Sequence, residues 1–194
     1  MLQVRSLLRA VVLLAAIGAS SHAAAANDIQ LVYNGVAAPN GAAPPATAAF
    51  DSWCAGVCFP TTRQTVNDPR SGRAKGEIFV WGKNFQYGDN GSLCFSEFIV
   101  IALAPGQIHV ASGDRGTCGA PIDPLLKPPL YPELGAQIVI AGGGDGLIAG
   151  GNGWYAGWTG SFTDRVFVGF GAPESGVGGI IYYDQLWISI SGGR

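Results

Sequence analysis

Residues 150–162 read GGNGWYAGWTGSF, and this stretch decides the fold. Its glycines follow a fixed order, with a GGxG turn, then a YxG step, then GxF. Glycine adopts positive φ and allows close backbone approach at little steric cost. Apolar residues at 147–148 enter the turn and aromatic residues leave it. The pattern predicts a tight β-turn followed by a glycine-kinked strand, as in a closed and curved sheet.

Residues 1–26 resemble a secretory signal peptide. Arg5 and Arg9 come first, and the apolar run at 10–19 is shorter than the roughly 20 residues that span a bilayer. Small residues at 24–26 fit cleavage after Ala25 or Ala26, whereas the alternative is a buried N-terminal helix. We therefore expect a secreted or periplasmic protein whose mature chain has no integral membrane segment.

The mature chain, residues 27–194, has about 168 residues and the size of a single domain. Without Arg5 and Arg9, 9 of the 11 basic residues remain against 13 acidic ones, for a net charge of −4. No basic patch is present, so nucleic acid is not an expected partner.

Four cysteines, Cys54, Cys58, Cys94 and Cys118, fall in the mature chain. An even number in a secreted chain indicates two disulfides, for which three pairings exist. The pairing we expect is Cys54–Cys58 with Cys94–Cys118. The C-x3-C spacing could hold a metal ion, but no Cys/His cluster supports one. We therefore expect neither a metal nor a cofactor.

Short apolar segments separated by glycine and proline turns predict an all-β domain of eight or nine antiparallel strands. Residues 50–58 are expected to form a pinned loop or short strand, residues 113–135 a long irregular connection, and no amphipathic helix is evident. A closed barrel is favoured over a sandwich because closure removes exposed edges. The expected strands are 29–34, 61–66, 76–81, 93–103, 107–111, 137–140, 155–162, 165–170 and 180–190.

An ordered set of landmarks resembles the dirigent / allene oxide cyclase barrel superfamily. The set comprises the glycine turn at 150–160, the Asp-Pro turn at 68–69 followed by GRAKG at 72–76, the hairpin at 93–108 and the final strand at 180–190. The resemblance implies a single closed, eight-stranded antiparallel barrel, a homotrimer, an apolar pocket and no cofactor. It also implies a protein that steers the coupling of phenoxy radicals or the cyclisation of an unstable epoxide.

Two departures from the dirigent pattern bear on activity. Dirigent proteins place a charged pair in and after the glycine turn, where this chain has Trp154 and Thr159. Their His-Asp pair at the end of the first strand corresponds to Asn34 and Gly35. The resemblance therefore implies the fold more strongly than the activity, and a non-catalytic ligand-binding or surface interaction module remains the alternative.

Glu77 is the first candidate catalytic residue. By strand alternation it shares a face with Phe79 and Trp81. If that face points into the barrel, the desolvated carboxyl could act as an acid or base. The alternative is that Glu77 faces solvent at the start of its strand.

Glu97 is the second candidate, on one face of its strand with Phe95, Ile99 and Ile101. A carboxylate in such a run needs a partner, for which Arg73 is a candidate, or it faces water. The readings as an acid/base group and as a structural ion pair both stay open.

Aromatic side chains are candidates for a ligand pocket, although ordinary core packing would also explain them. The binding candidates are Trp81, Tyr87, Trp154, Tyr155, Trp158, Tyr182 and Asp184. His109 is expected to be solvated, because alternation sets it opposite the apolar side of its strand. The expected function is binding of a small apolar or phenolic molecule, with cofactor-free steering of its cyclisation or stereoselective coupling.

Overall fold

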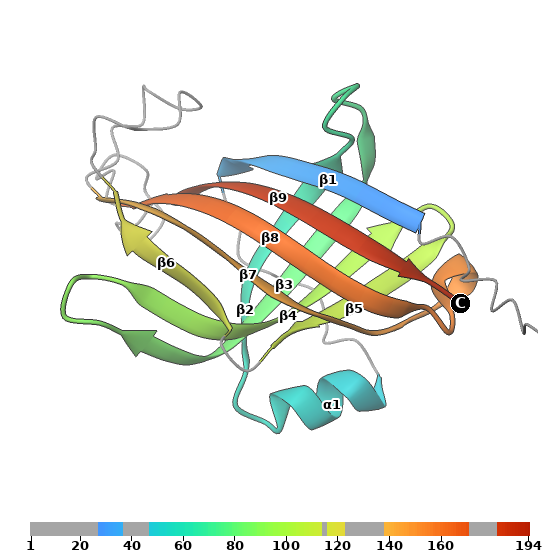
Figure 1. The fold of residues 1–194 in the computed structure, drawn as a ribbon, viewed down its shortest axis with the longest axis horizontal. Helices are drawn as coiled ribbons and strands as arrows, with labels where there is room; N and C mark the ends of the chain where they lie inside the picture. The colour runs from blue at the N-terminus through green and yellow to red at the C-terminus, as the bar shows by residue number, and fades with distance from the viewer. Residues whose placement is uncertain (1–26, 37–46, 114–115, 123–137, 171–181) are drawn as a thin grey trace, which may run out of the picture.

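The computed structural model describes residues 27–36, 47–113, 116–122, 138–170 and 182–194. These ranges contain nine strands, one short α-helix and a single 3₁₀ turn (Figure 1). The elements are β1 (Asn27–Val36), α1 (Ala48–Cys54), β2 (Phe59–Asn67), β3 (Ala74–Tyr87), β4 (Leu93–Leu103), β5 (Gly106–Ser112), β6 (Thr117–Pro121), β7 (Ile138–Gly151), η3 (Gly153–Tyr155), β8 (Thr159–Phe170) and β9 (Tyr182–Gly193).

Eight of the strands close into an antiparallel barrel, which confirms the predicted fold class. Strands β1 to β5 follow one another round the barrel, β7, β8 and β9 complete it, and β9 returns to β1. The extra strand, β6, pairs with both β4 and β7. Closure therefore pairs each barrel strand on both sides and leaves few exposed edges.

The barrel closes unevenly at the seam between β1 and β2. Strand β1 pairs with β9 along all ten of its residues, from Asn27 to Val36. It pairs with β2 through one register pair, Val32 with Asn67. We call this junction the seam.

The interior of the barrel is a continuous apolar core. It is rich in β-branched side chains, which pack well on a pleated surface. Its buried members are Leu31, Val66, Ile78, Val80, Ile99, Ile101, Ile108, Val110, Tyr155, Trp158, Phe162, Leu186, Ile188 and Ile190.

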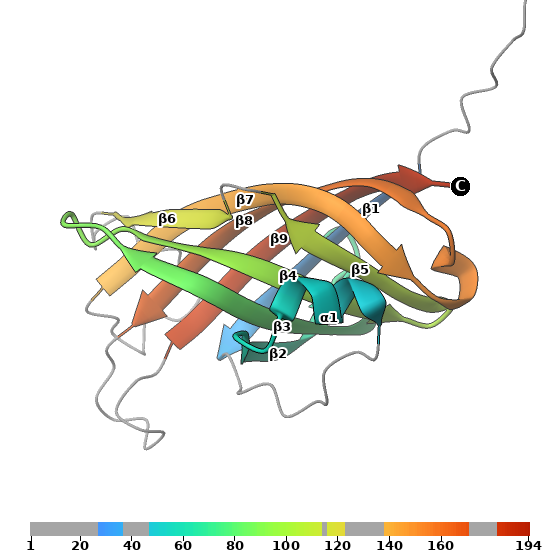
Figure 2. The same ribbon diagram turned by 90° about the horizontal axis from the view of Figure 1, so that it is seen from below.

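A second apolar cluster lies on the outside of the barrel, beneath α1. It consists of Phe50 from the helix, Trp81 from β3, and Phe98 and Val100 from β4. The Phe50 ring meets the rings of Trp81 and Phe98 edge-on, each with centroids 5.2 Å apart. Figure 2 shows α1 lying across the outside of β3, β4 and β5. We call this group the outer cluster.

The helix α1 was not predicted, and the expectation of a loop or short strand at 50–58 is wrong. The Thr47 hydroxyl accepts a hydrogen bond from the Phe50 N–H at 3.1 Å, which caps the first turn. Ala55 ends the helix in the left-handed region, with φ of 46°. Seven residues make too few turns for a periodic pattern, so tertiary packing of Phe50 stabilises this helix.

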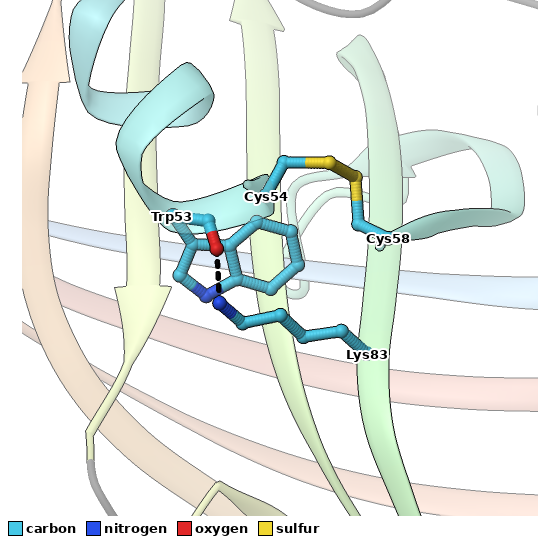
Figure 3. Close-up of a disulfide and its surroundings, with 4 residues drawn as sticks. All are labelled: Trp53, Cys54, Cys58 and Lys83. Carbon is cyan, nitrogen blue, oxygen red and sulfur yellow. Dashed lines mark hydrogen bonds between the residues drawn. A yellow bond between two sulfur atoms is a disulfide. The ribbon is translucent and has the colours of Figure 1, made fainter. Parts of the chain in front are cut away.

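The end of α1 is fixed by two contacts shown in Figure 3. The Cys54–Cys58 disulfide closes the loop that follows the helix. Lys83 of β3 donates a hydrogen bond to the Trp53 carbonyl and lies 4.7 Å from the centroid of the Trp53 ring. Both contacts hold the helix against the outer face of the barrel.

The glycine turn at 150–162 forms the predicted tight connection, now between β7 and β8. At Gly153, with φ of +55°, an added Cβ would lie 2.4 Å from the Pro105 carbonyl oxygen. At Gly160 it would lie 2.1 Å from the Ser191 carbonyl oxygen. Only glycine allows these approaches. The following strand begins at Thr159 rather than at residue 155, because η3 and the turn after it occupy residues 153–158.

Three further strands differ from the prediction. Strand β7 continues beyond the strand predicted at 137–140 and through the glycine tract, and β6 lies within the expected irregular connection. The separate segments predicted at 155–162 and 165–170 are one strand, β8. Cross-strand pairing overrides the low strand propensity of glycine here.

Both predicted disulfides are confirmed. The sulfur atoms lie 1.98 Å apart in Cys54–Cys58 and 2.13 Å apart in Cys94–Cys118. Cys94 and Cys118 face each other across β4 and β6. Disulfides are typical of proteins that fold in oxidising compartments. No helix in the described part of the chain has the length and hydropathy needed to cross a membrane.

Candidate functional site

Glu97 projects from β4 into the barrel interior. It has the same strand parity as the core residues Ile99 and Ile101, and 4% of it is exposed. The Thr117 hydroxyl of β6 donates a hydrogen bond to Glu97 Oε1. The backbone N–H of Glu97 donates to Ser112 Oγ at 2.8 Å. Glu97 is therefore a buried carboxylate with a hydrogen-bond partner and does not face water.

Asp164 projects from β8 into the same interior. Phe162 on one side of it belongs to the core and Val166 on the other packs against the core. Asp164 is 5% exposed, and its Oδ1 accepts a hydrogen bond from the Gly144 N–H. Its Oδ2 is buried and has no hydrogen-bond partner among the described residues. Burying a carboxylate oxygen without a hydrogen-bond partner costs free energy. This atom therefore favours binding a proton or a hydrogen-bond donor of a ligand.

Thr117 and Gly144 connect the two carboxyl groups. A Cβ added at Gly144 would lie 2.5 Å from Thr117 Oγ1, so the threonine lies directly against the glycine. The same hydroxyl binds Glu97, and the Gly144 N–H binds Asp164. We call Glu97, Thr117, Gly144 and Asp164 the carboxylate site. Any side chain at position 144 would force these groups apart.

The electrostatics of Asp164 differ from those of an ordinary carboxyl. Burial raises the pKa of Asp164 to about 6, the Gly144 N–H opposes that shift, and the nearby Asp145 carboxylate adds to it. A carboxyl with this pKa exchanges its proton close to physiological pH, where general acids and bases work best.

Thr62 adds another polar group to the interior. It lies opposite Val80, a core residue, in the β2–β3 pairing, and is 4% exposed. Its hydroxyl oxygen has no hydrogen-bond partner among the described residues. Buried polar atoms without a hydrogen-bond partner are uncommon in proteins, so those of Thr62 and Asp164 distinguish this interior from a purely apolar core.

Glu77 lies on the outside of the barrel. It is 2.7 Å from the Arg63 guanidinium, and its side chain is 43% exposed. The next residue, Ile78, points into the interior, so Glu77 points outward. The structure therefore shows the second alternative for Glu77, a carboxylate that faces solvent. Arg73, the partner suggested for Glu97, is exposed in the β2–β3 turn.

The aromatic binding candidates do not share one pocket. Trp81 is buried in the outer cluster, whereas Tyr87 and Trp154 are 79% and 66% exposed. Tyr155 and Trp158 pack edge-on in the core, with ring centroids 5.0 Å apart. The side chains of the two remaining candidates, Tyr182 and Asp184, lie outside the described residues.

His109 is buried, which corrects the expectation of a solvated histidine. It faces outward as alternation predicts, but its ring centroid lies 6.1 Å from that of Phe98 in the outer cluster, and it is 3% exposed. Burial lowers its pKa. The outward face at this position is a second core rather than a solvated surface.

A cleft of 440 Å³ lies at the seam, apart from the carboxylate site, with which it shares no residue. It is lined by Asp28, Ile29, Gln30, Leu31, Asp68, Lys75, Leu103, Ala104, Pro105 and Tyr155. Of the predicted ligand-binding residues, Tyr155 is the one that lines this seam cleft.

Asp164 was not among the residues predicted from the sequence. The available signal was its position two residues from Phe162 and two from Val166, which places a carboxylate on the apolar face of a strand. Nothing in the described residues groups three or more potential metal ligands. Comparison with family models, with curated proteins and with solved structures found no match to this chain.

Proposed function

We propose that this is a secreted barrel that binds a small apolar or phenolic molecule at the carboxylate site and steers its cyclisation by proton transfer. The observation that carries the proposal is the buried Oδ2 of Asp164, which has no partner among the described residues, together with a second buried carboxyl, Glu97, related to it through Gly144 and Thr117. Catalytic acids and bases are found where burial shifts their pKa toward working pH.

Asp164 is the proposed acid. Protonated on Oδ2, it donates its proton to a substrate oxygen as the C–O bond of that oxygen opens and a ring bond forms, and the carboxylate then takes a proton back from a carbon of the cyclised product. The sequence is redox-neutral and needs no cofactor. Glu97, oriented by Thr117, positions the substrate for the return of this proton to Asp164. The surrounding apolar core keeps water away from a reactive intermediate.

Within the resemblance to the dirigent / allene oxide cyclase superfamily, the departures from the dirigent pattern favour cyclisation over radical coupling. The positions that hold charged residues in dirigent proteins are Trp154, which is 66% exposed, and Thr159. The buried carboxyls of this chain come instead from β4 and β8. The homotrimer that the resemblance implies belongs to the same proposal.

Native mass spectrometry of the mature protein from its secretory host tests this proposal. We expect a trimer that retains an apolar or phenolic molecule, which then serves as the substrate for turnover assays. Asp164→Asn and Glu97→Gln should bind that molecule but lower its turnover by about 10²-fold or more. Glu77→Gln, a carboxyl on the outside of the barrel, is the matched control. Equal turnover by all three variants would refute the acid–base mechanism.

A non-catalytic ligand-binding module is the second candidate, and the seam cleft favours it. The cleft offers 440 Å³ beside Tyr155, within the usual size of a small-molecule site. A retained molecule that crosslinks to the cleft and is released unchanged would support this reading.

A further inference from the structure

Strand β1 runs past the end of its neighbour β2. The pair Val32–Asn67 joins the two strands, and Asn67 is the last residue of β2. The chain then turns through residues 68–73 into β3. Residues 27–31 of β1 therefore pair with β9 on one side and extend beyond β2 on the other.

The seam cleft lies along this same stretch. Four consecutive β1 residues, 28–31, line it, and they present about 13 Å of strand edge at about 3.3 Å per residue. The remaining walls come from the β2–β3 turn and the start of β3, from the end of β4 and the β4–β5 turn, and from η3. In the described part of the chain, no strand pairs with this edge, and such an edge is a template for another extended chain.

The floor of the cleft is the end of the apolar core. Leu31 and Tyr155 belong to the core, and Ile29 and Leu103 pack against it. An apolar side chain that enters the cleft would therefore meet a preformed apolar surface beside the strand edge.

The rim of the cleft is acidic on balance. Among the described residues that line the cleft, Asp28 and Asp68 carry negative charge and Lys75 carries positive charge. Lys75 Nζ lies 3.6 Å from Asp68 Oδ2, and Asp68 Oδ1 accepts hydrogen bonds from the Arg70 and Ser71 N–H groups. A basic or neutral occupant suits this rim better than an anion.

We propose that the β1 edge at residues 28–31 binds an extended peptide segment of another protein by β-strand addition. The added strand pairs with the β1 backbone, places an apolar side chain on the floor between Leu31, Leu103 and Tyr155, and carries a basic residue at the rim. This inference is independent of the proposed catalysis at the carboxylate site, because the seam cleft and that site share no residue.

Peptide binding measured by NMR tests the proposal. The probe is acetyl-Lys-Thr-Val-Thr-Leu-Thr-Lys-amide, compared with two N-methylated analogues, one methylated at the threonines and one at Val and Leu. Alternate N–H groups of a strand point to opposite edges. Strand addition therefore predicts that one analogue binds at least tenfold more weakly while the other binds like the parent. Amide shifts should centre on Ile29, Gln30 and Leu31.

Two exposed alanines provide matched variants. Ala104→Trp fills the cleft from the β4–β5 turn, and Ala156→Trp places the same side chain on a turn outside it. We expect at least tenfold weaker peptide binding for Ala104→Trp and unchanged binding for Ala156→Trp. The proposal is overturned if both N-methylated analogues bind equally, if no peptide binds at millimolar concentration, or if the edge is occupied by a second copy of this chain.

Discussion

The two faces of the β3–β4 hairpin both bury apolar side chains, yet their carboxylates have opposite environments. On the inner face, Ile99 and Ile101 accompany the buried Glu97. On the outer face, Trp81 lies beneath α1, and Glu77 is half exposed in an ion pair with Arg63. Alternation establishes which residues share a face, but two apolar faces leave the direction of the interior undecided.

The largest effects should come from truncating either apolar face. Phe98→Ala in the outer cluster should lower the free energy of unfolding by about 3–5 kcal/mol, and Ile99→Ala in the core by about 2–5 kcal/mol, because each leaves a cavity. Both residues are 0% exposed. Chemical denaturation of the two variants measures the losses. A loss below about 1 kcal/mol for Phe98→Ala would show that the outer face is not a second core.

Asp164 should make stability depend on pH. The pKa of an unperturbed aspartate, as in the unfolded chain, is 3.8, and the pKa of Asp164 in the folded protein is about 6. The folded state therefore holds the proton more tightly. The free energy of unfolding should therefore fall as pH rises through these two values, by ~3 kcal/mol in total from this group, of which ~2 kcal/mol is lost between pH 4 and pH 6, and stay lower above that range.

Asp164→Asn isolates this contribution. The difference in unfolding free energy between the variant and the parent, measured by denaturation at several pH values, should change by ~2 kcal/mol between pH 4 and pH 7. A difference that stays constant across this range would mean that Asp164 is not desolvated.

The disulfide at the end of α1 should have an intermediate effect, concentrated on the outer face. Cys54 and Cys58 are 4 residues apart, so removing their bridge with a double serine variant should cost ~2 kcal/mol. Trp53 and Trp81 should become more exposed, whereas Trp158 in the core should not. Fluorescence quenching of single-tryptophan versions measures this, and equal exposure of all three would contradict a local role.

The smallest effect should come from Glu77→Gln. The Arg63–Glu77 pair is roughly half exposed on both sides, so its loss should change stability by about 0.5 kcal/mol or less. Thermal denaturation at low and high salt measures the change. A loss above about 2 kcal/mol would place Glu77 in a more buried network than the structure has.

The barrel could be predicted because its signals are local. The hairpin around Pro105 and Gly106, the β-rich run at 93–103 and the glycine turn at 150–162 each specify their own geometry. The helix α1 could not be predicted, because Phe50 and Trp53 are fixed by contacts with distant strands. The glycine-rich part of β7, which follows the predicted strand at 137–140, was missed for a similar reason. Close packing against neighbouring strands, rather than residue propensity, keeps it extended.

The carboxylate site was half predicted. Glu97 stood out among apolar neighbours, whereas Asp164 was overlooked although its spacing is similar. The connection between them depends on Thr117 lying against Gly144, and on pairing of β6 with β4 and β7. The sequence of one strand alone does not specify how it pairs with distant strands.

Titration of Asp164 by carboxyl ¹³C NMR tests most directly whether the carboxylate site is poised for proton transfer. Spectra from pH 3 to pH 9, with Asp164→Asn to assign the signal, give its midpoint. The account predicts a midpoint pKa of about 6 for Asp164. A midpoint near the ordinary aspartate pKa of about 3.9 would contradict it, because Asp164 would then be a solvated carboxylate with no reason to carry a proton at working pH.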